Sequence, residues 1–113
     1  MHLTNNAVQK NCKQYGQIHE GNQITIEELV SAIGNENFTT AGLFEEFERI
    51  IKVMVGSTRD QLLSGTADGT FQLLGLDFMI DSCFKVWLIE ANCNPCLEES
   101  SAMLKKLLPN MLR

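Results

Sequence analysis

The chain has 113 residues, a length that allows one domain at most. It is 44% hydrophobic and 20% charged, which is ordinary for a folded protein and too apolar for a disordered one. Nine Lys and Arg against 14 Asp and Glu give a formal charge of −5, which argues against nucleic acid as a partner. No apolar run approaches the roughly 20 residues of a membrane span, and no signal-peptide pattern opens the chain, so no membrane partner is expected.

The start of the chain predicts a short helix followed by a loop. Residues 5–12 fit a helix, with Thr4 or Asn5 as its N-cap. Residues 15–23 are rich in Gly and polar side chains, which is typical of a surface loop.

The next helix carries clear signals at both ends. Thr25 and Glu28 stand three residues apart, the spacing of a capping box in which Thr25 is the N-cap. The helix is expected to run to Ile33 and to stop at Gly34, because glycine is common just after a helix.

A longer amphipathic helix follows, with Thr39 or Thr40 as its N-cap. Gly56 weakens it, so residues 58–63 are expected either to continue the helix or to form a separate turn. Charged residues lie mostly on one face, and the other face is expected to pack on the core. The apolar residues recur at three- and four-residue steps: Leu43, Phe44, Phe47, Ile50, Ile51, Met54 and Val55.

The central stretch predicts a β-hairpin. Two apolar runs, Phe71–Ile80 and Val86–Ala91, flank a polar break at Asp81–Lys85. Three polar side chains interrupt this apolar background: Asp77, Glu90 and Asn92.

The spacing of these three residues predicts that they share one face. Glu90 and Asn92 point the same way because side chains alternate along a strand. If Asp81 pairs with Val86, Asp77 falls directly opposite Glu90. Two facing carboxylates repel, so a buried pair would share a proton or hold a cation.

Two interpretations of this pattern remain open. Two carboxylates and an amide oxygen form the hard-oxygen ligand set that Mg²⁺ prefers, with phosphate supplying further ligands. The alternative is a pair of acids on a solvated strand face, which would have no ligand.

Four cysteines occur, and Cys93 and Cys96 form a CxxC pair. A zinc site would need a second such pair or nearby histidines, and a redox motif is only loosely matched. Reduced cysteines in a tight loop are the favoured interpretation.

The chain is expected to end in a helix whose first turn contains Glu98, Glu99 and Ser100. Pro109 should kink or end it. The fold class is therefore α+β: a small antiparallel sheet with a central hairpin and helices packed on one of its faces. The apolar stripe of this last helix comprises Met103, Leu104, Leu107, Leu108 and Met111.

Three segments carry a resemblance to a known family. They are His2–Lys10 (HLTNNAVQK), Gly75–Asp81 (GLDFMID) and Lys85–Pro95 (KVWLIEANCNP). In this order they resemble motifs of the tubulin tyrosine ligase-like proteins, members of the ATP-grasp superfamily. The resemblance implies that residues 1–113 form a single partial domain, the C-terminal portion of an ATP-grasp catalytic domain.

The resemblance also implies a function. Such enzymes use ATP to activate a carboxylate as an acyl-phosphate, which an amino group attacks to form an amide bond. The implied cofactors are ATP and Mg²⁺. The implied partners are a free amino acid (tyrosine, glutamate or glycine) and tubulin or another protein acceptor. The expected location is the cytoplasm and the microtubule cytoskeleton, including the cilium or basal body.

The resemblance assigns roles to particular residues. Beyond the metal ligands, no catalytic residue is assigned. The metal ligands implied are Asp77, Glu90 and Asn92, and the residues expected to reach ATP are His2, Leu3, Thr4, Asn5 and Ile89.

The family's catalytic domain is much longer than this chain and brings lysines from upstream segments to the phosphates. We therefore expect the 113 residues alone to show no ligase turnover and weak ATP binding at best. The chain is expected to be the C-terminal catalytic-lobe fragment of such a ligase. The alternative is a truncated, non-catalytic relative that binds a divalent ion or a protein.

Overall fold

The fold is described from a computed structural model, which defines residues 6–17, 19–64, 69, 71–99 and 101–111. The described part is α+β, as predicted, with one two-stranded antiparallel sheet. Contacts divide the chain into two compact units, residues 33–96 and the two terminal segments 1–32 and 97–113. Each unit is described by itself.

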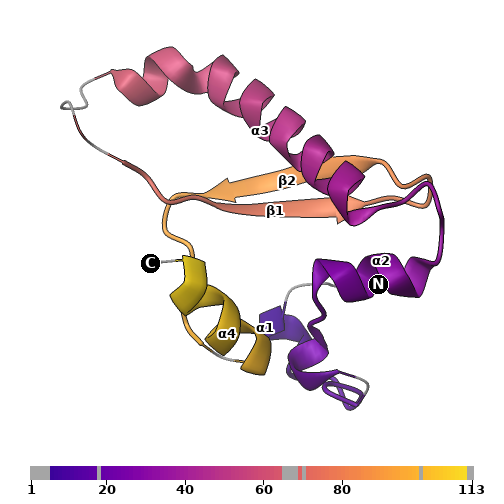
Figure 1. The fold of residues 1–113 in the computed structure, drawn as a ribbon. Coiled ribbons are helices and arrows are strands. Elements are labelled where there is room, and N and C mark those ends of the chain that lie inside the picture. The colour runs from indigo at the N-terminus through magenta and orange to yellow at the C-terminus, as the bar shows by residue number, and fades with distance from the viewer. Residues whose placement is uncertain (1–5, 18, 65–68, 70, 100, 112–113) are drawn as a thin grey trace. The chain divides into compact units, whose positions relative to one another are not determined.

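The first unit begins with α1 (Asn6–Gln9) and a single turn, η1 (Glu20–Asn22) (Figure 1). The predicted helix over 5–12 is thus shorter than expected, because turns replace it after Gln9. Its predicted caps, Thr4 and Asn5, lie outside the described residues. In the loop after α1, the side chain of Asn22 bonds to two earlier residues. It donates to Gln9 Oε1 at 3.0 Å and accepts from the Gly16 backbone N–H at 2.9 Å.

Helix α2 (Ile26–Ile33) has the predicted ends. The Thr25 backbone N–H donates to the Glu28 carboxylate at 2.7 Å, and the Glu28 N–H donates to Thr25 Oγ1 at 3.2 Å. The capping box is therefore confirmed. Gly34 follows with φ of 63°, a left-handed conformation in which glycine has no steric cost.

Helix α4 (Ala102–Met111) begins later than predicted. Its N-cap is Ser101, whose hydroxyl accepts from the Leu104 N–H at 3.3 Å. Glu98 and Glu99 precede the helix, and Ser100 lies outside the described residues. Pro109 lies inside α4 and does not end it.

The second unit comprises α3 (Thr40–Leu63), β1 (Gly75–Ile80) and β2 (Val86–Asn92), with α3 along one face of the hairpin (Figure 1). Thr39 caps α3 by accepting from the Gly42 N–H at 3.1 Å. The helix runs through Gly56 without a break, so residues 58–63 continue it.

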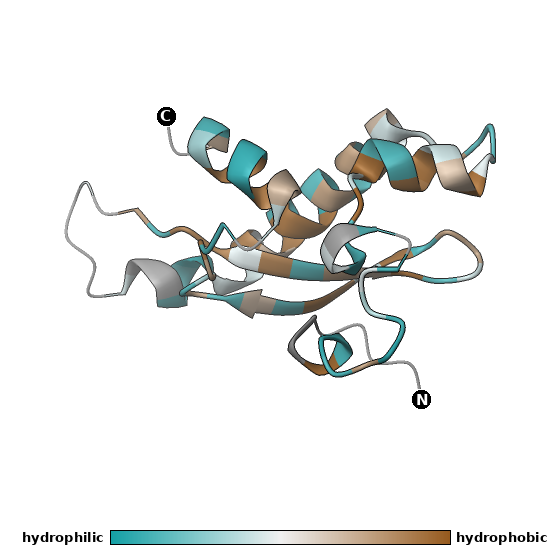
Figure 2. Ribbon diagram, turned by 90° about the horizontal axis from the view of Figure 1, so that it is seen from below, coloured by the Kyte–Doolittle hydropathy of each residue, from teal (hydrophilic) through white to brown (hydrophobic). Residues whose placement is uncertain are grey.

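A narrow apolar contact joins α3 to the hairpin. Leu43 is buried, and the rings of Phe47 and Phe78 lie 4.4 Å apart between centroids. Phe44 and Val55, which we expected in the same stripe, are 51% and 40% exposed. Two strands are too narrow to cover the whole apolar surface of α3, and Figure 2 shows hydrophobic segments along both the helix and the strands.

The hairpin loop is organised by one carboxylate. Asp81 Oδ1 accepts from the backbone N–H groups of Cys83 at 2.8 Å and Lys85 at 3.0 Å. Asp81 Oδ2 accepts from the indole N–H of Trp87 at 2.8 Å, and Lys85 Nζ lies 4.0 Å from the centre of that ring. These donors, the indole first, hold the pKa of Asp81 below its usual value.

Many large apolar side chains are exposed in the described part of the chain. Val53 is 62% exposed and Ile89 is 57% exposed, while few side chains are fully enclosed. No helix among the described residues combines the length and apolar character that crossing a membrane requires. Exposed apolar patches beyond a few hundred Å² tend to drive association.

We expect the substitution Asp81→Asn to destabilise the hairpin. The Asn oxygen still accepts from Cys83 and Lys85, but no acceptor remains for the Trp87 indole. Because the folded-state pKa of Asp81 is lowered, its contribution is present above the ordinary Asp pKa, roughly 3.9, and is lost as pH falls through the folded pKa.

This prediction is checked by urea unfolding at several pH values, followed by fluorescence of Trp87, the single tryptophan. The variant should unfold at lower urea than the parent chain at neutral pH, and this difference should shrink in acid. Asp60→Asn, at an exposed position on α3, is the matched control. Equal unfolding curves for parent and Asp81→Asn at neutral pH would contradict the prediction.

We also expect the isolated chain to self-associate. Static light scattering should give an apparent mass that rises with concentration. The substitution Val53→Lys should reduce that rise, because it replaces an exposed apolar side chain with a charged one on the solvent side of α3. A constant monomeric mass over the same range would show that these exposed side chains do not drive association.

Candidate functional site

The two acids predicted to face each other do so. Asp77 on β1 pairs with Glu90 on β2, and Gly75 pairs with Asn92 two residues further along. Directly opposed residues of antiparallel strands place their Cβ atoms about 4.5–5.5 Å apart. The hairpin therefore brings Asp77, Glu90 and Asn92 together, and all three are exposed.

The pairing near the loop differs from the predicted one. Val86 pairs with Ile80, where we expected Asp81, so the loop has five residues. The Asp81 backbone N–H instead donates to the Lys85 carbonyl at 3.0 Å, and its carboxylate organises the loop. Phe78 then pairs with Leu88, and the next pair is Asp77 with Glu90, so Ile89 is an extra residue that forms a β-bulge.

The bulge decides which face Glu90 occupies. Phe78 faces α3, so its partner Leu88 faces α3 as well. Regular alternation would return Glu90 to that helix-covered face. The extra residue turns Glu90 to the opposite face, where Asp77 lies. The expected acid pair thus exists, but it depends on a bulge that the sequence analysis did not predict.

The amide of Asn92 connects the two acids. Its Nδ2 donates to Glu90 Oε1 at 3.1 Å and lies 3.5 Å from Asp77 Oδ2. The amide group thus contacts both carboxylates.

The two carboxyl groups interact directly. The hydrogen bond to Glu90, together with partial burial and the charge of Glu90, raises the pKa of Asp77. Hydrogen bonds from Asn92 and from Asp77 lower the pKa of Glu90. The two acids are therefore inequivalent, and protonation of Asp77 is favoured over protonation of Glu90.

The donor set fits a divalent cation. A cation between the strands would offset the two negative charges, and rotation of the Asn92 amide would present Oδ1 in place of Nδ2. Within the described residues, no group of three His, Cys, Asp or Glu side chains could hold a metal ion alone, so the amide is an essential part of this set. Asp77, Glu90 and Asn92 could hold Mg²⁺.

Of the other predicted site residues, the structure describes only Ile89. His2, Leu3, Thr4 and Asn5 lie outside the described residues. Ile89 is the bulge residue and its side chain is 57% exposed.

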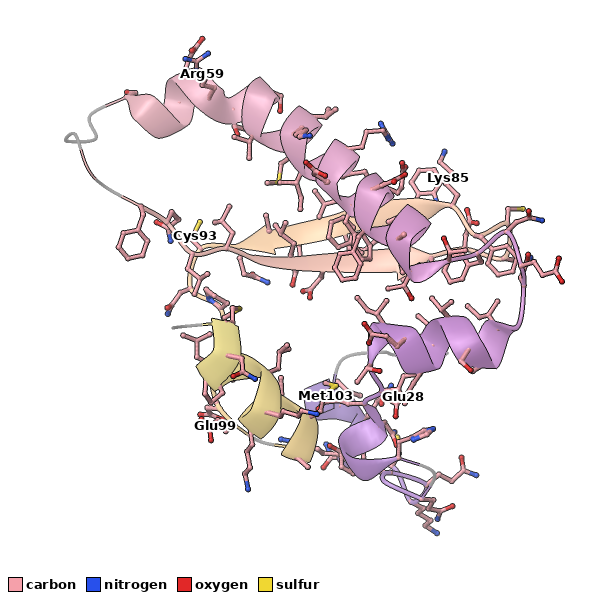
Figure 3. All side chains as sticks on the ribbon, in the orientation of Figure 1. Glu28, Arg59, Lys85, Cys93, Glu99 and Met103 are labelled. Atoms are coloured by element: carbon pink, nitrogen blue, oxygen red, sulfur yellow. The ribbon has the colours of Figure 1, made fainter. Side chains whose placement is uncertain are left out.

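The cysteines form no site in the described part of the chain. Cys93 and Cys96 are both exposed and free, and no metal-binding cluster includes them. Figure 3 shows Cys93 at the open end of the hairpin and Lys85 near its loop end. This agrees with cysteines in a loop that happen to be three residues apart.

The first unit contains a cavity of about 450 Å³. Three of its polar residues, Thr25, Glu28 and Ser101, are engaged in helix caps. Among the described site residues, none of Asp77, Ile89, Glu90 and Asn92 lines it. The full lining comprises His19, Gln23, Thr25, Glu28, Ser101, Met103, Lys106, Leu107 and Asn110.

The described part of the chain is α+β, and its hairpin pairs two carboxylates beside an amide. Comparison with known proteins identifies the family of the chain. The model of the Tubulin-tyrosine ligase family matches residues 1–113, and the chain belongs to that family.

Relatives include proteins named as glycylases. The chain is 34% identical to protein polyglycylase TTLL10 of Mus musculus over 118 residues, which cover 98% of this chain and 17% of the relative. It is 35% identical to tubulin glycylase 3D of Tetrahymena thermophila, covering 98% of this chain and 11% of the relative. It is 32% identical to a Homo sapiens protein named inactive polyglycylase TTLL10, covering 98% of this chain and 18% of the relative.

We expect Glu90→Gln to lower the pKa of Asp77. The substitution removes the neighbouring negative charge and the carboxylate that hydrogen-bonds with Asp77, which are causes of the raised pKa. Carbon-13 NMR of the Asp77 carboxyl group across a pH titration measures the change. In the parent chain this carbon should titrate above ordinary Asp values, and in the variant close to them.

The matched control is Glu99→Gln, which removes an acid that precedes α4 in the other unit. An unchanged Asp77 titration in Glu90→Gln would show that the two carboxyl groups do not interact in solution.

Proposed function

We propose that the chain is the C-terminal catalytic-lobe segment of an ATP-dependent amino-acid ligase that modifies tubulin or a related protein. The observation that carries the proposal is the meeting of Asp77, Glu90 and Asn92 on the open face of the hairpin. Family membership over all 113 residues supports the same conclusion.

In this proposal the hairpin holds Mg²⁺. Asp77 and Glu90 would bind it through carboxylate oxygens, and Asn92 through its amide oxygen. When bound, the ion neutralises the phosphate oxygens of ATP and aligns the γ-phosphate for attack by a substrate carboxylate. Without it, two acids and a triphosphate would repel each other.

The remaining ATP contacts are proposed for His2, Leu3, Thr4, Asn5 and Ile89. The position of Ile89 supports its proposed contact with ATP, because its apolar side chain is exposed beside Glu90. An apolar residue next to the metal ligands could pack against a nucleotide.

The names of the relatives favour glycine as the amino acid and a protein carboxylate as the acceptor. They include both a protein polyglycylase and a tubulin glycylase, so tubulin and other proteins are both candidate acceptors. A tubulin substrate would place the protein at the microtubule cytoskeleton, in the cytoplasm or the cilium.

A second candidate function is a non-catalytic module that binds a divalent ion or a protein. One relative carries the word inactive in its name, although it matches 98% of this chain. The same hairpin could therefore occur in a protein without turnover.

We expect Asp77→Asn to abolish metal binding while preserving the fold. In the enzyme that contains this chain, glycine incorporation should fall by about 10²–10³-fold, the usual cost of removing one electrostatic contact to the transition state. The melting temperature should not fall, because the substitution removes repulsion between two carboxylates.

The measurements are Mn²⁺ binding by electron paramagnetic resonance, labelled-glycine incorporation into tubulin, and thermal unfolding. Glu99→Gln is the control variant, an acid far from the pair in sequence. Full turnover by Asp77→Asn would overturn the ligase proposal. Mn²⁺ binding by a parent protein that shows no turnover would favour the non-catalytic module.

A further inference from the structure

We propose that Gln72, Gly75 and Pro95 act together as positioning residues for Asn92. We refer to these three residues as the Asn92 clamp. The inference rests on the proposed function, since Asn92 matters there as the third metal ligand. It concerns how this ligand is held, which neither the family match nor the relatives specify.

The first part of the clamp is a close approach between Gly75 and Pro95. Gly75 pairs with Asn92 across the hairpin. A Cβ atom on residue 75 would lie 2.9 Å from Pro95 Cβ, 3.6 Å from Pro95 Cα and 3.9 Å from Asn92 Cβ. The first distance is too short for two carbon atoms, so only glycine allows Pro95 to fold back onto the strand pair.

The second part is a hydrogen bond from Gln72. Its Nε2 donates to the backbone carbonyl of Cys93 at 2.6 Å. Gln72 precedes β1, whereas Cys93 directly follows Asn92, so this bond ties the end of β2 to the chain that leads into β1. Figure 3 places Cys93 at this open end of the hairpin.

The clamp therefore fixes the chain directly after a single ligand. Asn92 is the last residue of β2, and strand ends open more easily than strand centres. Glu90 and Asp77 lie inside the ladder and are held by strand pairing. Asn92 depends on the contacts made just beyond it, at residues 93 and 95.

A misplaced Asn92 should weaken metal binding without removing it. Groups that orient a metal ligand typically contribute about 10–100-fold to metal affinity. Loss of the clamp should therefore cost about tenfold or more in Mn²⁺ affinity, while Asp77→Asn abolishes binding.

The test uses paired substitutions that isolate the steric contact. Gly75→Ala should weaken Mn²⁺ binding because its Cβ displaces Pro95. The double variant Gly75→Ala/Pro95→Gly removes the opposing Cβ and should bind Mn²⁺ more tightly than Gly75→Ala. The double variant Gly75→Ala/Pro95→Ala keeps a Cβ at residue 95 and should not recover. Gln72→Leu should weaken binding independently of this steric effect.

Mn²⁺ affinity is measured by electron paramagnetic resonance on variants whose circular dichroism shows an intact fold. The NMR signals of the Asn92 side-chain amide provide a second, metal-free measurement. In the parent chain the two amide protons should be distinct and slow to exchange, and in Gly75→Ala they should exchange faster. In the Gly75→Ala/Pro95→Gly variant they should exchange more slowly than in Gly75→Ala.

The outcomes separate this inference from the proposed function. If the parent binds no Mn²⁺, the metal site is wrong, and the amide signals still test the clamp. If the parent binds Mn²⁺ but Gly75→Ala binds equally well with unchanged amide exchange, the clamp is wrong. Equal recovery by the glycine and alanine double variants would also overturn it, because the steric contact would then not be the cause.

Discussion

The repulsion between Asp77 and Glu90 is the constraint around which the hairpin is built. Two carboxylates directly opposed on neighbouring strands disfavour the pairing that brings them together. The Asn92 amide relieves part of this cost by donating to the carboxylates, and the raised pKa of Asp77 reflects the neighbouring Glu90. The rest of the second unit must hold the strands together against what remains.

Two sets of contacts do so, one on each side of the acid pair. Toward the loop, the Asp81 carboxylate binds two backbone N–H groups and the Trp87 indole, which closes the turn. On the other face, α3 packs on the strands through Phe47 and Phe78. An isolated two-stranded hairpin is only marginally stable in water, so packing against a helix is needed before an unfavourable acid pair can be tolerated.

Local signals in the sequence predicted local structure well. The Thr25–Glu28 capping box, the stop at Gly34 and the Thr39 cap depend on residues a few positions apart, and the structure has all of them. The acid pair was also predicted, although the assumed pairing of Asp81 with Val86 was wrong. A bulge at Ile89 compensates by one residue, and no glycine or other local signal marks it. The start of α4 depends on which residue caps it, and the exposure of Phe44 depends on the width of the sheet. The periodicity of apolar residues reports neither.

The bulge also supports the proposed metal site. Without the extra residue, Glu90 would face α3 and meet its apolar surface, and the ladder would contain no acid pair. With the extra residue, Ile89 has no partner in the strand ladder, and the ladder is interrupted there. Two like charges, Asp77 and Glu90, then face each other on the side of the hairpin away from α3. Natural sequences usually avoid such local costs except where a site requires them. A divalent cation would turn the opposed charges into an attraction, so the geometry that destabilises the empty hairpin would stabilise the loaded one.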